Sequence, residues 1–212
     1  MEHIEILMQR YPELEVCRDS IVQAVQGLIL SYKSGGKLLV CGNGGSSADC
    51  AHIVGELMKA FVLPRRLTEA QRETLRVAGD MDESMGGLLQ QGLPAVDLTA
   101  QAGLNTAFLN DAEPALCFAQ QAFAYSKQGD VLLGLSTSGN SENAVKAGIA
   151  AKSKGAFTIG LTGERHCRMD EVFDLVIHVP AKETYRIQEY HLSVYHAICL
   201  AVEQEFFGKG LG

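Results

Sequence analysis

The chain has 212 residues, of which 47% are hydrophobic and 20% are charged, and this composition fits an ordinary soluble globular protein with a sizeable core. Its formal net charge is −7 and its Lys and Arg residues are scattered, which argues against nucleic acid as a partner. No apolar run approaches the roughly 18 residues that span a bilayer, and the acidic N-terminus lacks the features of a signal peptide, so we expect a cytoplasmic protein without a membrane partner.

Helical and strand patterns alternate along the chain. Apolar residues recur at helical spacings over 4–32, with an expected break at Tyr11-Pro12. A short apolar strand at 37–41 leads into a glycine-rich loop, and a helix is expected over 46–61. Further strands are expected at 95–99, 131–136, 157–162 and 175–179, with helical patterns at 113–126, 141–154 and 184–206.

This alternation predicts an α/β fold. Short apolar strands between helices indicate a parallel sheet covered on both faces, and five of them indicate a doubly wound sheet with an N-terminal helical segment. We interpret 1–212 as a single domain. Residues 64–93 lengthen the first crossover, and we interpret them as a solvated surface insertion in preference to a lid or a subunit contact.

The six cysteines show no CxxC spacing, and most of them neighbour apolar residues. Cysteine is among the residues most often buried. The pattern therefore favours buried free thiols in a reducing compartment.

The glycine-rich loop at 42–47 is a candidate anion site. It precedes a helix, whose unpaired backbone amides and positive dipole end favour a bound negative charge. It is not a dinucleotide fingerprint, because Ser47 stands where GxGxxG needs its third glycine and no acidic residue ends a second strand about 20 positions later. No GxxxxGK[ST] string occurs either.

A second Gly/Ser-rich loop, at 134–143, also follows an expected strand. Ligands of doubly wound sheets bind beyond the carboxyl ends of the strands, and the loop offers the hydroxyls of Ser136, Thr137, Ser138 and Ser141. This cluster predicts a phosphate monoester site. The alternative is that Ser138, Asn140 and Ser141 only cap the next helix.

Three segments, CGNGGSSADCAHIVGEL, GDVLLGLSTSGNSENAVKA and RIQEYHLSVYH, resemble the sugar isomerase (SIS) family. Within it they most resemble the phosphoheptose isomerases, over nearly the whole chain apart from 64–93. The resemblance implies a homotetramer that converts sedoheptulose 7-phosphate to D-glycero-D-manno-heptose 7-phosphate through an enediol(ate), the first step towards nucleotide-activated heptose. It also implies that the second loop binds the sugar phosphate.

The resemblance further implies roles for individual residues. Glu56 matches the general base and His196 the partnering acid/base of the family. Members of the family bind one Zn²⁺ per active site through residues that match His52, Glu56, Gln188 and His196. The substrate-binding positions match Asn43, Gly44, Gly45, Ser46, Asn110, Asp111, Ser136, Thr137, Ser138, Ser141 and Gln188.

Spacing alone supports part of this assignment. His52 and Glu56 lie at i and i+4 and share a helix face, although an exposed pair would look the same. Gln188 and His196 are eight residues apart, about 80° around a helix, and can face one cleft. His191 competes with His196, and spacing does not decide between them. We interpret the remaining histidines of the later loops and strands, His166 and His178, as having no catalytic role.

Two positions depart from the family pattern. Ala60 stands where phosphoheptose isomerases commonly have an arginine, for which Lys59 or an arginine of 64–67 could substitute, and Tyr185 replaces an acidic residue. Both changes affect the expected sugar more than the reaction type. The main rival is a non-catalytic protein of the same fold that resembles the DnaA-binding replication-initiation factor, which lacks residues matching Glu56 and His196. A sugar-phosphate-sensing regulator would usually carry a basic DNA-binding segment. We favour the enzyme.

Overall fold

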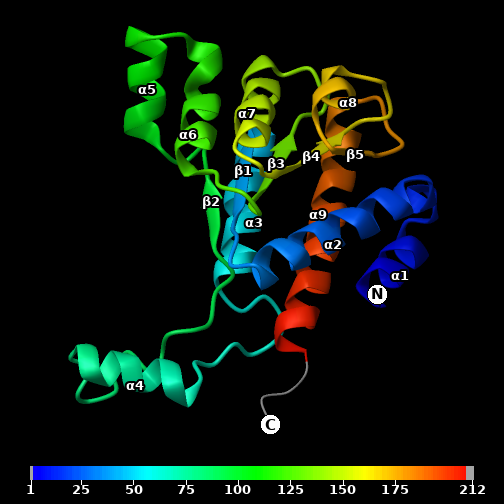
Figure 1. Ribbon diagram of the computed structural model, residues 1–212. Coiled ribbons are helices and arrows are strands. Elements are labelled where there is room, and N and C mark those ends of the chain that lie inside the picture. The colour runs from blue at the N-terminus through cyan, green and yellow to red at the C-terminus, as the bar shows by residue number, and fades with distance from the viewer. Residues whose placement is uncertain (1, 209–212) are drawn as a thin grey trace.

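The computed structural model describes residues 2–208 and contains a five-stranded, all-parallel sheet (Figure 1). The strand order is β2-β1-β3-β4-β5. The strands are β1 (Leu38–Gly42), β2 (Ala95–Asp97), β3 (Val131–Leu135), β4 (Phe157–Thr162) and β5 (Leu175–His178). The predicted doubly wound sheet is therefore confirmed.

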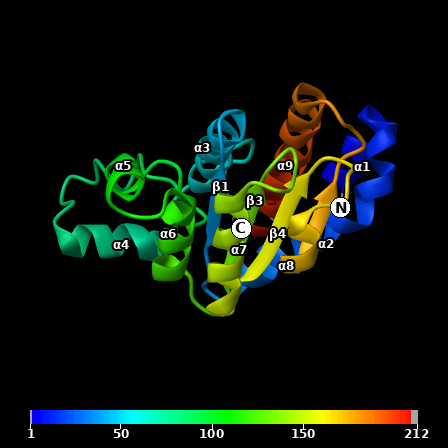
Figure 2. The same cartoon turned by 90° about the horizontal axis from the view of Figure 1, so that it is seen from above.

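Helices cover both faces of the sheet, as the view from above shows (Figure 2). One face carries α1 (Glu2–Arg10), α2 (Arg18–Lys33), α3 (Gly45–Met58) and α9 (Thr184–Phe207). The other carries α5 (Ala102–Asp111), α6 (Cys117–Tyr125), α7 (Glu142–Ser153) and α8 (Arg168–Val172). Within residues 2–208, no helix is both long and apolar enough to cross a membrane.

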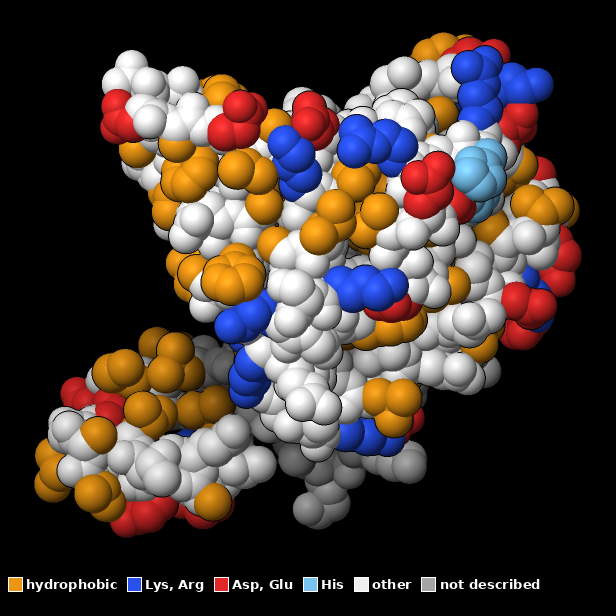
Figure 3. Space-filling view, turned by 45° about the horizontal axis from the view of Figure 1, so that its top comes forward, with side chains coloured by type: hydrophobic (Ala, Val, Ile, Leu, Met, Phe, Trp, Pro, Cys, Tyr) orange, Lys and Arg blue, Asp and Glu red, His pale blue; other side chains and the backbone are white. Residues whose placement is uncertain are grey.

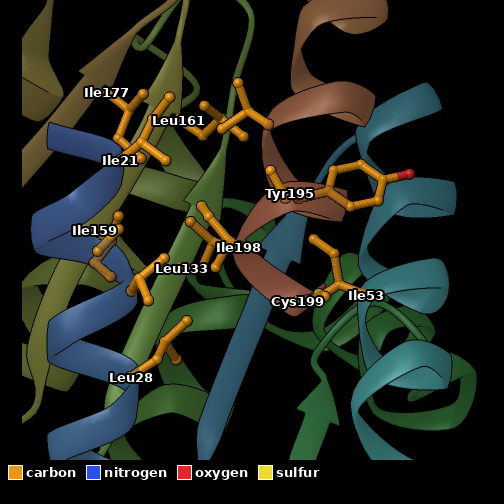
Figure 4. Packing of buried hydrophobic residues seen from close by; sticks show 14 of the residues in the cluster. Ile21, Leu28, Ile53, Leu133, Ile159, Leu161, Ile177, Tyr195, Ile198 and Cys199 are labelled. Carbon is orange, nitrogen blue, oxygen red and sulfur yellow. The ribbon is translucent and has the colours of Figure 1, made fainter. Parts of the chain in front are cut away.

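Successive side chains of each strand point alternately into two apolar cores on opposite faces of the sheet. Leu38 and Val40 point into the larger core, whereas Leu39 and Cys41 point into the smaller one. In the larger core, residues of α2, α3 and α9 interlock with those of β3, β4 and β5 (Figure 4). This packing fixes α3 and α9 side by side on one face. All six cysteines are buried and free, as predicted.

The helix and strand bounds differ from the predictions in a few places. The break at Pro12 is confirmed, since a 3-10 helix (Pro12–Cys17) begins there. Strand β2 stops at Asp97, whose carboxylate accepts a hydrogen bond from the Thr99 backbone and starts a turn. In place of one helix over 113–126, a short 3-10 helix at Pro114 precedes α6. Helix α5 was not predicted, because Leu104 and Phe108 are too few apolar positions to establish a helical period over its ten residues.

Residues 64–93, which we call the arm, project from the body with α4 (Glu69–Ala78) at their centre (Figure 1). Thr68 caps α4 by accepting a hydrogen bond from the Gln71 backbone. The base of the arm is held by Arg65, which is fully buried and paired with Glu203 of α9 at 2.9 Å. The carboxylate of Glu203 also accepts the backbone amides of residues 61–63. The arm therefore has a fixed root and an exposed tip.

Candidate active site

The glycine-rich loop joins β1 to α3 and brings α9 close to the start of α3. Gly44 has a φ of +57°, a conformation that glycine adopts without strain. A Cβ at Gly45 would lie 2.5 Å from Nε2 of Gln188, so glycine is needed there for this side chain to approach. The structure thus brings Gly44, Gly45 and Gln188 together, with Ser46 buried at the first turn.

The second loop, which we call the phosphate loop (136–141), gathers its hydroxyls at one point. Oγ of Ser136 lies 2.8 Å from Oγ of Ser141 and 3.5 Å from Oγ of Ser138. Ser141 is the residue before α7, yet its side chain makes no capping hydrogen bond. Ser138 accepts a hydrogen bond from the Asn140 backbone within the loop. Capping of α7 by Ser141 therefore does not account for the cluster.

The segment after β4, residues 163–170, packs against the phosphate loop. Gly139 has a φ of +64°, and a Cβ there would lie 2.1 Å from the sulfur of Cys167. The ring of His178 bridges Oδ1 of Asp170, at 2.7 Å, and the carbonyl of Gly163, at 2.8 Å. Burial alone would raise the pKa of Asp170, but hydrogen bonds from His178 and from the Cys167 backbone hold it below its usual value. His178 therefore has a structural partner on each nitrogen.

A carboxylate and two imidazoles meet between α3 and α9. Nε2 of His52 lies 3.1 Å from Oε1 of Glu56 and 3.5 Å from Nε2 of His196. Nζ of Lys59 lies 3.2 Å from the other oxygen of Glu56, which is nearly buried. Burial and the neighbouring His52 lower the pKa of His196, so this ring is neutral near pH 7. We call this group the acid–base cluster (His52, Glu56 and His196).

The outer nitrogen of His52 is also held. Nδ1 of His52 lies 3.0 Å from the hydroxyl of Tyr195, which donates its proton to Oδ1 of Asp49 at 3.1 Å. Burial raises the pKa of Tyr195, so the hydroxyl keeps that proton. Tyr195 therefore fixes the orientation of the His52 ring, with Nε2 directed at Glu56 and His196.

His191 is not part of the cluster. Its side chain is fully buried, and neither ring nitrogen has a hydrogen-bond partner. Burial lowers its pKa to about 4. Spacing alone did not decide between His191 and His196. In the structure, His196 is the histidine that faces His52.

The cluster and Gln188 lie at different levels along the packed helices α3 and α9. Eight residues of α-helix separate Gln188 from His196 by about 12 Å along the axis. His52 similarly lies two turns beyond Gly45, against which Gln188 rests. The structure therefore places Gln188 with the glycine-rich loop rather than beside the imidazoles. Among residues 2–208, no group of three or more His, Cys, Asp or Glu side chains is already arranged to hold a metal ion, and this includes the acid–base cluster.

Two predicted substrate residues lie apart from both loops. Asn110 and Asp111 end α5 on the exposed surface, where the amide of Asn110 donates to Oδ1 of Asp111 at 2.6 Å. A cavity of about 480 Å³ instead separates the glycine-rich loop from α5 and α6. The side chains of Asn43 and Asn143 exchange hydrogen bonds of 2.9 Å at its wall and so tie the two loops together. Sequence reasoning missed Asn143, whose one signal was its place just inside the helix after the phosphate loop.

The structure separates the candidate substitutes for the missing arginine. Arg65 is buried and donates to the backbone carbonyls of Leu57 and Glu56, so its guanidinium points into the protein and not towards the acid–base cluster. Lys59 is exposed and contacts the carboxylate of Glu56. Tyr185 lies exposed at the start of α9. Of these basic residues, Lys59 is the one beside the cluster.

The sequence matches the SIS domain family over residues 5–163. It is 38% identical over 190 residues to the phosphoheptose isomerase of Burkholderia pseudomallei, covering 90% of this chain and 84% of that protein. It is 37% identical over 208 residues to that of Citrifermentans bemidjiense, covering 98% and 94%. The structure resembles that of phosphoheptose isomerase from Neisseria gonorrhoeae, with a TM-score of 0.72, 31% identity and coverage of 95% and 96%. The corresponding values for the Francisella tularensis enzyme are 0.76, 27%, 96% and 95%.

Proposed function

We propose that this chain, which belongs to the SIS domain family and within it to the phosphoheptose isomerases, interconverts sedoheptulose 7-phosphate and D-glycero-D-manno-heptose 7-phosphate. This reaction supplies the heptose phosphate for nucleotide-activated heptose. The observation that carries the proposal is the meeting of Glu56 with two imidazoles on α3 and α9. Helix α3 begins at the glycine-rich loop and α9 begins beside the phosphate loop, so both helices connect the proton-transfer groups to the candidate anion sites.

The acid–base cluster supplies the groups that an aldose–ketose isomerisation needs. Glu56 removes a proton from C1 of the ketose while the C2 carbonyl oxygen gains one, which gives an enediol(ate). Return of a proton to C2, with loss of the O1 proton, then gives the aldose. His196 is neutral near pH 7 and moves protons at the two oxygens. Lys59 places a positive charge 3.2 Å from the carboxylate that acts as the base.

The test is direct. The wild-type protein is incubated with sedoheptulose 7-phosphate, and the aldose product is followed by NMR of the sugar. An enediol route also places solvent deuterium on the product carbon when the reaction runs in D₂O. Absence of turnover across five-, six- and seven-carbon ketose phosphates would contradict the proposal and favour the non-catalytic binding protein.

We also propose that the acid–base cluster holds one Zn²⁺. Its support is the donor chemistry, because Nε2 of His52 lies 3.1 Å from a carboxylate oxygen and 3.5 Å from a second imidazole nitrogen. Tetrahedral zinc with bonds of about 2.0–2.1 Å keeps its ligands about 3.3–3.4 Å apart. Gln188, the fourth predicted ligand, lies against Gly45 and would have to move. Bound zinc would polarise the sugar oxygens as a Lewis acid.

Elemental analysis of protein purified without chelator tests this site. We expect about one zinc per chain in the wild type and none in His52→Ala. Thermal unfolding gives a readout independent of activity, since a chelator should lower the melting temperature of the wild type and leave that of His52→Ala unchanged. Metal-free wild-type protein with full activity would rule the zinc out while leaving the isomerase proposal intact.

We further propose that the chain assembles as a homotetramer. Support comes from the tip of the arm, where Val77, Met81, Met85, Leu88 and Leu89 are between 46% and 83% exposed. Figure 3 shows hydrophobic side chains over much of the arm. A patch of this kind usually marks a contact surface rather than a purely solvated insertion. Light scattering should give a tetramer for the wild type and smaller species for Met81→Asp with Leu88→Asp, and a monomeric wild type would contradict the proposal.

A cytoplasmic location is proposed on the chemistry of the thiols. All six cysteines are free, and proteins of oxidising compartments tend to pair theirs. Cell fractionation tests the location, and recovery of the protein outside the cytoplasm would refute it.

A further inference from the structure

A cavity of about 190 Å³ adjoins the phosphate loop and carries charges that the loop itself lacks. Three segments far apart in the sequence build it. Thr137 and Ser138 come from the phosphate loop, Arg165 from the segment after β4, and Lys182 and Thr184 from the start of α9. We call it the cationic pocket.

The cations of the pocket are not fully neutralised by the protein. The side chain of Arg165 is exposed and makes no ion pair or hydrogen bond with any residue of 2–208. Nζ of Lys182 lies 3.2 Å from Oε1 of Glu164, and this pair is 60% and 38% exposed. Two cations thus face one carboxylate, in a chain whose net charge is −7. Such a local excess of positive charge favours an anion.

The neutral donors of the pocket point to a phosphate group. Thr137 and Ser138 supply hydroxyls from the phosphate loop, and the first backbone amides of α9 begin at Thr184. The residue before α9, Glu183, makes no side-chain capping hydrogen bond, so these amides remain available to a ligand. Hydroxyls and amides alone would leave a phosphate dianion without a counter-charge. A guanidinium can supply two parallel charge-assisted hydrogen bonds to such a group.

We propose that Arg165 and Lys182 bind the phosphate of the substrate, which lies between the phosphate loop and the first turn of α9. Gln188 follows one turn after Thr184, and His196 lies a further two turns along the same helix. The part of the sugar nearest the phosphate therefore lies beside Gln188. The identity of the sugar rests on the function proposed above, but the affinity for phosphate does not.

Charge-removing variants test the role of each cation. Arg165→Gln and Lys182→Gln should each raise KM for sedoheptulose 7-phosphate about tenfold or more while changing kcat less than twofold, because the phosphate contact is equally present in substrate and transition state. Both side chains are exposed, so the fold should survive, which circular dichroism checks. Lys154→Gln is the matched control. It removes the same charge from the C-terminal end of α7, away from the pocket, and should leave KM unchanged.

Glu164 gives a test of opposite sign. Glu164→Gln should lower KM, because it removes a carboxylate that repels the phosphate and frees Lys182 from its ion pair. A purely structural role of this segment would raise KM in every variant. Added salt should also raise KM more in the wild type than in Arg165→Gln, since part of the attraction that salt screens has been removed.

Binding of inorganic phosphate, followed by phosphorus NMR, separates this proposal from the proposed function. Weaker phosphate binding in Arg165→Gln than in Lys154→Gln supports the pocket even if the wild type turns over no ketose phosphate. Equal phosphate binding and equal KM in all four variants would overturn the pocket, and isomerase activity would then stand without it.

Discussion

Acid should destabilise this protein through His191 in particular. The unfolded chain binds a proton at this imidazole near its usual pKa of about 6.5, whereas burial lowers the folded pKa to about 4. The unfolded state therefore binds more protons between these values, and the stability present above pH 6.5 is lost as the pH falls towards 4. The shift of about 2.5 units corresponds to about 3 kcal/mol in total, of which about 2 kcal/mol is lost between pH 7 and pH 5.

His191→Phe removes the titrating group and keeps a ring of similar shape. Urea unfolding at pH 7 and pH 5 should show a drop in unfolding free energy that is about 2 kcal/mol smaller in His191→Phe than in the wild type. His191→Leu should give the same difference if the phenyl ring overpacks the site. His196→Gln is the control for the other histidine with a lowered pKa, which is half-buried and should contribute less. Parallel pH profiles for His191→Phe and the wild type would refute the reasoning.

Three further perturbations test the site. Glu56→Gln should cut the rate by about 10² to 10⁴ while the sugar phosphate still binds, and equal turnover by the two proteins would exclude Glu56 as the base. Ser138→Ala with Ser141→Ala should raise KM far more than it lowers kcat, and an unchanged KM would remove the phosphate loop from the site. Glu203→Gln should cost about 3–5 kcal/mol of stability in urea unfolding, because it leaves Arg65 buried without its carboxylate, and a loss under 1 kcal/mol would show that water or another group replaces the pair.

The fold was largely predictable because its elements are locally encoded. Five short apolar runs between helical patterns predicted the parallel sheet, and the alternation of Leu38, Leu39 and Val40 between two cores explains why each run reads as continuously apolar. Helix α5 was not predicted, because none of its residues is buried and its few apolar residues do not form a clear helical pattern. The exposed apolar surface at the tip of the arm was also not predicted, since residues such as Met81 and Leu88 are scattered among polar ones in the sequence. A sequence pattern shows which residues are apolar but not which neighbours they find.

The site was predictable where its residues are close in sequence, and not where distant segments meet. The pair of His52 and Glu56 follows from helical spacing, and it lies on one face as predicted. Its contact with His196, across 144 residues, depends on how α3 and α9 pack on the sheet. The same packing sets Gln188 against Gly45, two turns away from the cluster, although spacing alone allowed it to share one cleft with His196.

The roles of the basic residues also could not be predicted from the sequence, because their partners come from distant segments. An arginine near residue 65 looked able to replace the one missing at Ala60, yet Arg65 turns inward, because Glu203 and two backbone carbonyls compensate its charge there. Arg165 stands in no recognised motif, yet it faces the phosphate loop without a partner among residues 2–208. The two arginines differ because Arg65 has a carboxylate partner, Glu203, and Arg165 has none among residues 2–208. This difference depends on the packing of distant segments. A charged residue next to a motif is therefore weak evidence of binding, whereas an unpaired charge beside a loop of hydroxyls is a specific reason to expect an anion.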